Sequence, residues 1–257
     1  LMDKKIVLTI AGSDPSGHAG SQADLKTLSE CGAKGVSAVT AITGHDQTAG
    51  LAIHPTAADV LTQQLAAACR EQTPAAIKIG MVATQANIRV LTWFLRHTPA
   101  PHVVIDPILH SSSGIPLLEN KAFSFYRQQL LPMASLITPN LREASALAGQ
   151  QVAGEETMRV AAEAIYNEIN HYRMDQTKPL AILIKGGHLI GDPIDMLYDG
   201  KEFSLFSAKR INDGNVSGTG CRFSSALAAY LAQGEDLRSA IEKAQSYLLE
   251  WIKQVTA

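Results

Sequence analysis

The sequence predicts a three-layer α/β/α domain around a central, mostly parallel sheet, and two patterns carry that prediction. Short, nearly continuous apolar runs rich in β-branched residues alternate with longer amphipathic runs, as expected of parallel strands covered on both faces. Glycine-rich or polar segments follow several apolar runs, and ligand sites in such sheets lie beyond the carboxyl ends of the strands. We expect one domain over residues 1–257, because no linker-like segment divides the chain.

The individual elements follow from these periodicities. Buried strands are predicted at Ile6–Ile10, Val36–Ile42, Ala76–Ile79, Val103–Ile105, Leu136–Thr138 and Leu180–Ile184. Helices are predicted near Ala23–Cys31, Ala58–Ala68, Gln85–His97, Lys121–Leu131 and Arg159–Ile169. Asp199-Gly200 between Ile194–Tyr198 and Phe203–Phe206 predicts a hairpin at one sheet edge. A final helix is indicated by an apolar face of Leu237, Ile241, Ala244, Leu248 and Trp251.

Composition and charge exclude several classes of protein. Of the 257 residues, 46% are hydrophobic and 18% charged, which is typical of a globular chain. The formal net charge of −2 and the lack of a basic block argue against nucleic-acid binding. The three widely spaced cysteines form neither a disulfide framework nor a zinc motif. With no secretory signal pattern and no membrane-length apolar run, these features predict a cytoplasmic protein without a membrane partner.

The segment Asn215-Val216-Ser217-Gly218-Thr219-Gly220-Cys221 opens onto small and apolar residues at helical spacing. Gly218 and Gly220 allow consecutive N–H groups to converge on one oxygen, and the positive end of the helix dipole attracts an anion. Cys221 falls in the first helical turn, where the same field favours its thiolate. The alternative interpretation is a glycine turn before a core helix that carries a buried cysteine.

Two carboxylates are predicted near strand ends. Asp106 directly follows the fourth strand, and Glu143 lies one turn into the helix after Thr138-Pro139-Asn140. Paired carboxylates with bound water commonly hold Mg²⁺ against a nucleotide. Asn140 and Glu143 are also spaced as a helix capping box, which is the plainer interpretation of these two residues.

Three further features could face a ligand. The loop Ala11–Gly20 contains three glycines and matches neither G-x-G-x-x-G nor the P-loop pattern, so it is either a phosphate-side flap or a plain connection. Asp24, just inside the next helix, is either a helix-terminal charge or a ligand contact. Lys185 precedes two glycines after the sixth strand, which suits phosphate contact, although a solvated loop lysine is the commoner case.

Taken together, these segments resemble the hydroxymethylpyrimidine and phosphomethylpyrimidine kinases of thiamine biosynthesis, within the ribokinase superfamily. The resemblance covers roughly Ile6 to Leu231. It rests on seven motifs in the family's order, namely Ala11-Gly12-Ser13-Asp14, Gln22-Ala23-Asp24-Leu25-Lys26, Lys78-Ile79-Gly80-Met81, Asp106-Pro107, Thr138-Pro139-Asn140 with Glu143, Lys185-Gly186-Gly187-His188 and Gly218-Thr219-Gly220-Cys221.

The resemblance implies a ribokinase-like fold and ATP-dependent phosphorylation of 4-amino-5-hydroxymethyl-2-methylpyrimidine and its monophosphate, with Mg²⁺ as cofactor. A homodimer is also implied. The catalytic residues would be Gly218, Thr219 and Gly220 around the γ-phosphate, with Cys221 as base. The remaining implied contacts are ATP at Asn140, Lys185 and Thr219, Mg²⁺ near Asp106 and Glu143, and pyrimidine at Gly12, Asp24, His45 and Met81.

The acceptor side departs from the family pattern. Where these kinases usually have Ala-Gln-Asn-Thr, this chain has Gly44-His45-Asp46-Gln47-Thr48, so His45 replaces a glutamine. A neutral imidazole has one donor and one acceptor and can mimic part of that amide's pairing. Further departures are His18, Ser112, Ile115 and Ser217.

Three alternatives to the pyrimidine kinase therefore stay open. A pyridoxal-type vitamer kinase would use the same fold with a pyridine alcohol as acceptor. A catalytically weak vitamer-binding protein would explain the drift at Ser112 and Ile115. A cysteine hydrolase pairing Cys221 with His188 would explain the thiol but not the surrounding nucleotide-type motifs.

Overall fold

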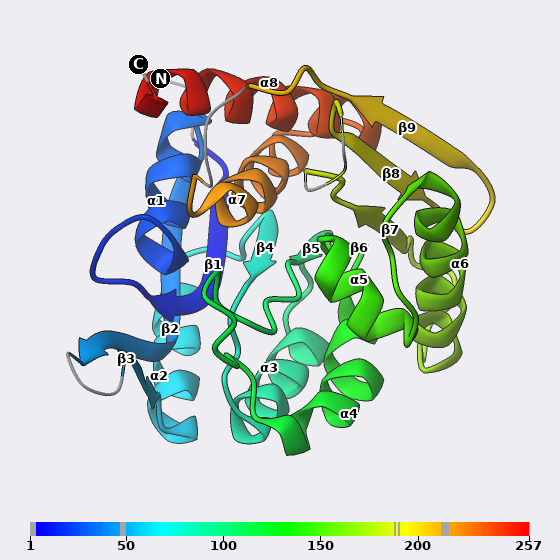
Figure 1. The fold of residues 1–257 in the computed structure, drawn as a ribbon. Helices are drawn as coiled ribbons and strands as arrows, with labels where there is room; N and C mark the ends of the chain where they lie inside the picture. Colours follow the sequence, from blue (N-terminus) through cyan, green and yellow to red (C-terminus); the bar gives the residue numbers. More distant parts are fainter. Residues whose placement is uncertain (1–3, 47–49, 188, 190, 212–215, 257) are drawn as a thin grey trace.

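The computed structural model describes residues 4–46, 50–187, 189, 191–211 and 216–256. Within these residues nine strands form one sheet in the order β3-β2-β1-β4-β5-β6-β7-β8-β9 (Figure 1). The pairs from β2 to β7 are parallel, whereas β3, β8 and β9 run antiparallel to their neighbours. The strands are β1 (Ile6–Ser13), β2 (Lys34–Asp46), β3 (Gly50–Pro55), β4 (Ala76–Ile79), β5 (His102–Ile105), β6 (Leu136–Ile137), β7 (Ala181–Ile184), β8 (Ile194–Tyr198) and β9 (Phe203–Ser207).

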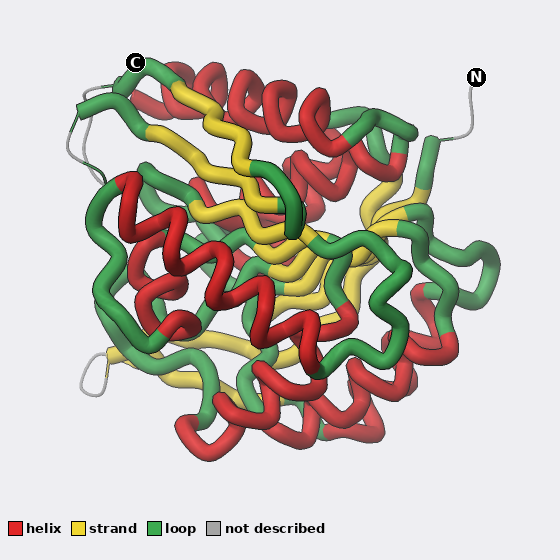
Figure 2. Tube along the Cα trace, turned by 90° about the vertical axis from the view of Figure 1, so that its right-hand side faces the viewer, coloured by secondary structure: helices red, strands yellow, loops and turns green. Residues whose placement is uncertain are grey.

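Helices cover both faces of this sheet, so the predicted three-layer α/β/α architecture is confirmed (Figures 1 and 2). On one face lie α1 (Gly20–Glu30), α7 (Thr219–Ala232) and α8 (Leu237–Thr256). On the other lie α2 (Ala58–Ala68), α3 (Gln85–His97), α5 (Leu141–Ala148) and α6 (Glu155–His171).

Alternation along the strands builds the two cores. Neighbouring side chains of a strand point to opposite faces, and both faces here are covered, so each strand must be apolar throughout. In β1, Val7 packs beneath α1 and α7, whereas Leu8 packs against the opposite helix layer. In β5, Val104 and Ile105 divide in the same way, which explains the nearly continuous apolar runs in the sequence.

The two edges of the sheet test the sequence prediction differently. The hairpin at Asp199-Gly200 is confirmed as the antiparallel pair β8–β9. At the other edge β2 extends to Asp46 and pairs with β3, a strand that the sequence pattern did not predict. The apolar run of β3 is only three residues long, and its side chains are half-buried, so the pattern did not mark it as a buried strand.

The prediction of one helix over Lys121–Leu131 is wrong. The segment is divided into a 3₁₀ turn (Asn120–Ala122), a single α turn α4 (Phe123–Phe125), a π turn (Tyr126–Leu130) and a second 3₁₀ turn (Leu131–Met133). Pro132 has no N–H to continue an α-helical ladder, and its ring excludes the carbonyl one turn earlier. In the described part of the chain no helix has the length and apolarity needed to cross a membrane.

Candidate active site

The glycine-rich segment forms the start of α7 at the carboxyl edge of the sheet. Gly218 is the N-cap residue, with a left-handed φ of 83°, and α7 begins at Thr219. The first helical hydrogen bond runs from the Arg222 N–H to the Gly218 carbonyl, so the amides of residues 219–221 precede the helical ladder. A Cβ at Gly218 would overlap the carbonyl oxygen of His18 in the loop before α1. The predicted glycine turn at a helix N-terminus is therefore present, and it packs directly against that loop.

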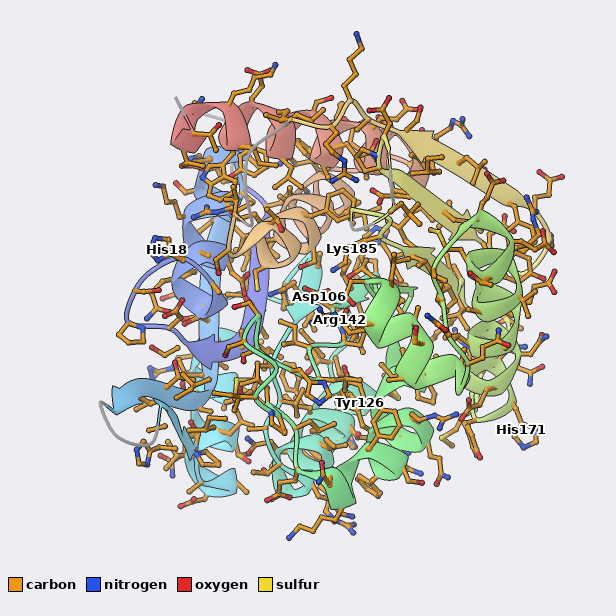
Figure 3. All side chains as sticks on the ribbon, viewed as in Figure 1. His18, Asp106, Tyr126, Arg142, His171 and Lys185 are labelled. Carbon is orange, nitrogen blue, oxygen red and sulfur yellow. The ribbon has the colours of Figure 1, made fainter. Side chains whose placement is uncertain are left out.

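An ion pair lies beside this turn, with Asp106 and Lys185 close together near the middle of the molecule in Figure 3. The Lys185 ammonium donates to Asp106 Oδ1 at 2.6 Å. Thr138 and Ser224 hydroxyls donate to the two Asp106 oxygens at 3.2 and 3.3 Å. Burial opposes the charge of Lys185, but Asp106 and then Glu143 outweigh it and raise its pKa. A Cβ at Gly220 would lie 3.3 Å from Lys185 Nζ, so the pair adjoins the start of α7.

Asn140 and Glu143 form the capping box that the sequence offered as the plainer interpretation. The Asn140 N–H donates to Glu143 Oε2 at 2.8 Å, and the Glu143 N–H donates to Asn140 Oδ1 at 2.9 Å. Burial raises the pKa of Glu143 to about 8, with Lys185 lowering it and Asp106 raising it further. A capping role does not exclude a ligand role, because a second carboxylate oxygen stays free of the box.

The carboxylates suit a hydrated divalent cation better than a protein-only metal cage. Among the described residues no three His, Cys, Asp or Glu side chains form a metal-binding cluster. Mg²⁺ usually keeps several waters and binds through one or two carboxylates together with substrate phosphates. Asp106, which adjoins Gly220, and Glu143, whose pKa responds to the charges of Lys185 and Asp106, match that donor set.

Glu143→Gln is expected to stabilise the ligand-free protein at alkaline pH. The raised pKa means that the folded protein binds the Glu143 proton more tightly than the unfolded chain, so stability is lost as pH rises from about 4.5 to about 8. A neutral amide keeps the capping box and removes that loss. At pH 9 the variant should melt a few degrees higher, for a gain on the order of 1 kcal/mol, and at pH 5 it should match wild type. The exposed Glu71→Gln is the control; a lower melting temperature for Glu143→Gln at pH 9 would contradict the assignment.

The predicted acceptor residues Gly12 and Met81 lie together. A Cβ at Gly12 would lie 2.8 Å from the Met81 sulfur, so the glycine allows the thioether to approach the end of β1. Met81 is buried and follows β4. Gly12 near the end of β1 and Met81 just after the adjacent β4 thus adjoin each other at the carboxyl edge of the sheet.

Asp24 does not line a surface in this structure. Its side chain has no exposed area and pairs with Lys78 Nζ at 2.8 Å. It also accepts hydrogen bonds from the hydroxyls of Thr9 and Ser225 at 2.6 and 2.8 Å. The described partners of Asp24 are thus interior groups of β1, β4 and α7, and its contact with the acceptor stays a prediction.

His45 was expected to follow the second strand, and this expectation is corrected. Its backbone lies within β2, opposite Leu51 of β3. The position of its side chain falls outside the described residues, as does His188 of the hydrolase alternative. The β2–β3 pair therefore carries the position at which this chain departs from the family pattern.

Cys221 occupies the first turn of α7 as predicted, but its thiolate is not favoured. Burial raises its pKa to about 11, and the Lys78 charge only partly offsets that effect. The Gly20 N–H donates to the sulfur and also lowers the pKa. In the ligand-free protein the cost of removing the thiol from water thus exceeds the helix-terminal field, so the side chain is a thiol at neutral pH.

Three polar residues of the site were not recognised as functional from the sequence. Lys78 stands alone among apolar residues in β4, and a buried lysine needs a charged partner. Ser224 and Ser225 are adjacent hydroxyls in an otherwise apolar helix. All three residues could have been noticed in the sequence as polar groups at buried positions. Such groups normally need a hydrogen-bonding partner, which indicates a polar network in the interior.

A pocket of about 500 Å³ is lined in part by Thr219 and Gly220 at the start of α7. Its polar end is formed by the Asn140, Lys185 and Thr219 region, and its far wall comes from α8. The α8 wall includes Gln245, Leu248 and Ile252. A volume of this size, with an apolar wall and a cationic, amide-rich end, suits a flat heterocycle joined to phosphates.

The fold and this edge of the sheet define a class of small-molecule phosphotransferases. A glycine-rich helix N-terminus, a lysine–aspartate pair and a nucleotide-sized pocket meet where ligands of parallel α/β sheets bind. Positioning and charge neutralisation supply most of the rate in phosphoryl transfer, and groups of this kind are suited to both.

Comparison with known proteins identifies the family. The family model described as phosphomethylpyrimidine kinase matches residues 14–257. The hydroxymethylpyrimidine/phosphomethylpyrimidine kinase of Haemophilus influenzae is 38% identical over 250 residues, covering 95% of this chain and 89% of that protein. The thiamine biosynthesis bifunctional protein ThiED of Geobacter sulfurreducens is 38% identical over 248 residues, covering 96% of this chain but only 49% of that protein. This chain thus spans about half the length of the bifunctional relative.

A solved structure extends the comparison to bound ligands. The pyridoxal kinase of Staphylococcus aureus in complex with AMP-PCP and pyridoxal superimposes with a TM-score of 0.82 at 33% identity, covering 96% of this chain and 87% of that one. The chain belongs to the phosphomethylpyrimidine kinase family. The resemblance seen in the sequence and the ribokinase-like fold that it implied are confirmed.

Proposed function

We propose that the chain transfers the γ-phosphoryl group of ATP to the primary alcohol of 4-amino-5-hydroxymethyl-2-methylpyrimidine, and then phosphorylates the resulting monophosphate. The single observation that carries the proposal is that Lys185, paired with Asp106, lines the 500 Å³ pocket together with Thr219 and Gly220 at the start of α7. Family membership supports the reaction class, and the Haemophilus relative's name supports the acceptor.

Each part of the site would have a separate task. The α8 wall would hold the adenine, and the amides of residues 219–221 would stabilise charge on the transferred phosphoryl group. Lys185 would steady the phosphates, with Asn140 beside it. Mg²⁺ bound near Asp106 and Glu143, mostly through water, would neutralise phosphate charge. Cys221, in its thiolate form, would accept the proton of the acceptor hydroxyl, while Gly12 and Met81 would contact the ring.

A pyridoxal-type vitamer kinase is the second candidate. The Staphylococcus aureus structure binds AMP-PCP and pyridoxal on the same fold, and the two acceptors share a primary alcohol on a flat nitrogen heterocycle. His45 stands where the pyrimidine kinases usually have glutamine, so the acceptor side is where the two candidates diverge.

Turnover against an acceptor panel tests the proposal. ATP consumption would be measured with hydroxymethylpyrimidine, its monophosphate, pyridoxal and pyridoxine, and each product identified by mass spectrometry. We expect the highest kcat/KM with the two pyrimidines. A pyridine alcohol with a higher value would replace the leading function by the second candidate, and binding without turnover would favour a vitamer-binding protein.

His45→Gln separates the two acceptors further. If His45 contacts the ring, the amide restores one donor and one acceptor, so pyrimidine phosphorylation should be preserved or improved. His45→Ala should raise the acceptor KM. The increase should correspond to about 1–3 kcal/mol of lost binding free energy, the cost of leaving a buried polar group unpaired, and the KM for ATP should stay nearly constant. Unchanged acceptor KM values in both variants would remove His45 from the site. Weaker pyridoxal turnover in His45→Gln, without improved pyrimidine turnover, would favour the pyridoxal kinase.

Assembly, domain organisation and location stay predictions. The family resemblance predicts a homodimer, which sedimentation of the purified protein would test. A single domain over residues 1–257 and a cytoplasmic location likewise remain expectations from the sequence.

A further inference from the structure

A fully buried polar network lies one helical turn along α7 from Cys221. Asp24 of α1 is bound by Lys78 of β4, whose ammonium donates to both carboxylate oxygens at 2.8 Å. Thr9 of β1 and Ser225 of α7 donate to the same carboxylate. None of these four residues has exposed surface. The network therefore joins two strands and two helices through a single carboxylate.

Burying this ion pair in the core carries a large desolvation cost. Burial opposes the charge of Lys78, yet Asp24 raises its pKa, so the lysine is charged inside the protein. Replacing a buried pair with neutral groups is often harmless to stability, whereas removing one partner is strongly destabilising. Stability alone does not account for a charged pair at this place, so its position relative to the site becomes informative.

The network fixes the helix that carries Cys221. Ser225 follows Cys221 by four residues, so the two side chains lie on the same face of α7, one above the other. The preceding residue, Ser224, lies 3.3 Å from Asp106 Oδ2, but its hydroxyl is closer to the Gly220 and Cys221 carbonyls of its own helix, at 3.0 and 3.1 Å. The bond from Ser225 to Asp24, at 2.8 Å, is therefore the attachment that holds this face of α7 against the sheet.

We propose that Lys78, Asp24 and Ser225 are positioning residues that hold Cys221 in its reactive orientation toward the acceptor. Asp24 anchors α7 through Ser225, and Lys78 holds Asp24 in place while its cation lies near the thiol. The inference rests on the proposed kinase function. It gives the Lys78-Ile79-Gly80-Met81 motif a role distinct from ring contact.

Ser225→Ala isolates the anchor without breaking the ion pair. We expect kcat to fall on the order of tenfold or more, since small displacements of reacting groups are costly, while the KM for ATP stays constant. Cys221 should also react with iodoacetamide at a changed rate, read by mass spectrometry of its peptide. The matched control is Ser135→Ala, which removes a hydroxyl bonded to the Val103 backbone at the opposite end of the strands.

The double variant Asp24→Asn/Lys78→Met tests the charges. Single substitutions leave one buried charge unpaired and are expected to unfold the protein partly, whereas the neutral pair should melt near wild type. We expect the double variant to fold but to turn over at least tenfold more slowly, with the KM for ATP unchanged. A merely structural pair would instead recover wild-type kcat together with wild-type stability.

The outcomes separate this inference from the proposed function. If wild type phosphorylates no acceptor, the function fails and Cys221 alkylation alone decides the positioning role. If wild type turns over, then wild-type kcat and alkylation in both Ser225→Ala and the double variant overturn the inference. Losses of kcat that only follow the loss of melting temperature, as in Ser135→Ala, overturn it as well.

Discussion

Cys221→Ala is expected to reduce kcat about 10²–10⁴-fold, the usual contribution of a general base, and to leave the KM for ATP nearly unchanged. In the proposed function the nucleotide would be held by the backbone amides of α7 and by the pocket that Gly220 lines, neither of which depends on the sulfur. Steady-state kinetics with saturating acceptor would measure the effect. Equal turnover in the alanine variant would end the base assignment, and a large loss of ATP affinity would make the residue structural.

The raised pKa of Cys221 adds a pH signature to the same variant. The pKa of Cys221 is about 11 in the ligand-free protein. At pH values below 11, each increase of one pH unit therefore raises the thiolate fraction about tenfold. The kcat/KM, which reports the free enzyme, should therefore increase between pH 7 and pH 10 in wild type. Cys221→Ala should lose this increase. A rising profile that persists in the variant would assign the titration to another group.

Gly220→Ala is expected to reduce turnover on the order of 10²-fold without destabilising the fold. The residue lies in the first turn of α7, where alanine is favoured over glycine by about 1 kcal/mol. Its new methyl group would lie 3.3 Å from Lys185 Nζ and 3.7 Å from Asp106 Oδ2, in the space where phosphate oxygens must approach. Kinetics and thermal melting of the same preparation would separate the two effects.

Gly218→Ala provides the contrast. Its φ of 83° and the overlap with the His18 carbonyl should cost both stability and activity. Gly149→Ala is the control for backbone strain alone, because Gly149 has a φ of 67° but open space around its Cβ position. If the melting temperature and the rate of Gly220→Ala fall together, the glycine-rich segment would be interpreted only as a turn that starts α7.

Much of the fold was predictable because both faces of the sheet are buried. A short, mostly apolar run marked β4, and amphipathic periodicity marked the helix at Gln85–His97, both with the boundaries that the structure has. The pattern failed at a half-buried edge strand and where the backbone is irregular. The apolar run of β3 spans only three residues, and the Tyr126–Leu130 π turn has the same apolar spacing as an ordinary helix over so short a stretch.

The site was predictable in its loops and not in its interior. Gly218, Asp106 and Lys185 follow strands or begin helices, so topology alone brings them to one edge. The burial of Asp24 depends on a partner from β4, and sequence spacing does not indicate which of two distant charged residues will meet. The raised pKa of Cys221 was missed for the same reason, since desolvation depends on the packed structure.

The bond between Ser225 and Asp24 joins residues 201 positions apart, and this separation governs when a newly made chain becomes an enzyme. Thr9, Asp24 and Lys78 all precede Thr219, the first residue of α7, by about 140 residues or more. At roughly 5–20 residues per second, the start of α7 is synthesised about 7–28 seconds after Lys78. Until then the growing polypeptide holds its buried carboxylate and lysine without the helix that covers them. A chain terminated anywhere before Thr219 would therefore have no phosphoryl-transfer activity, however completely its first strands had assembled.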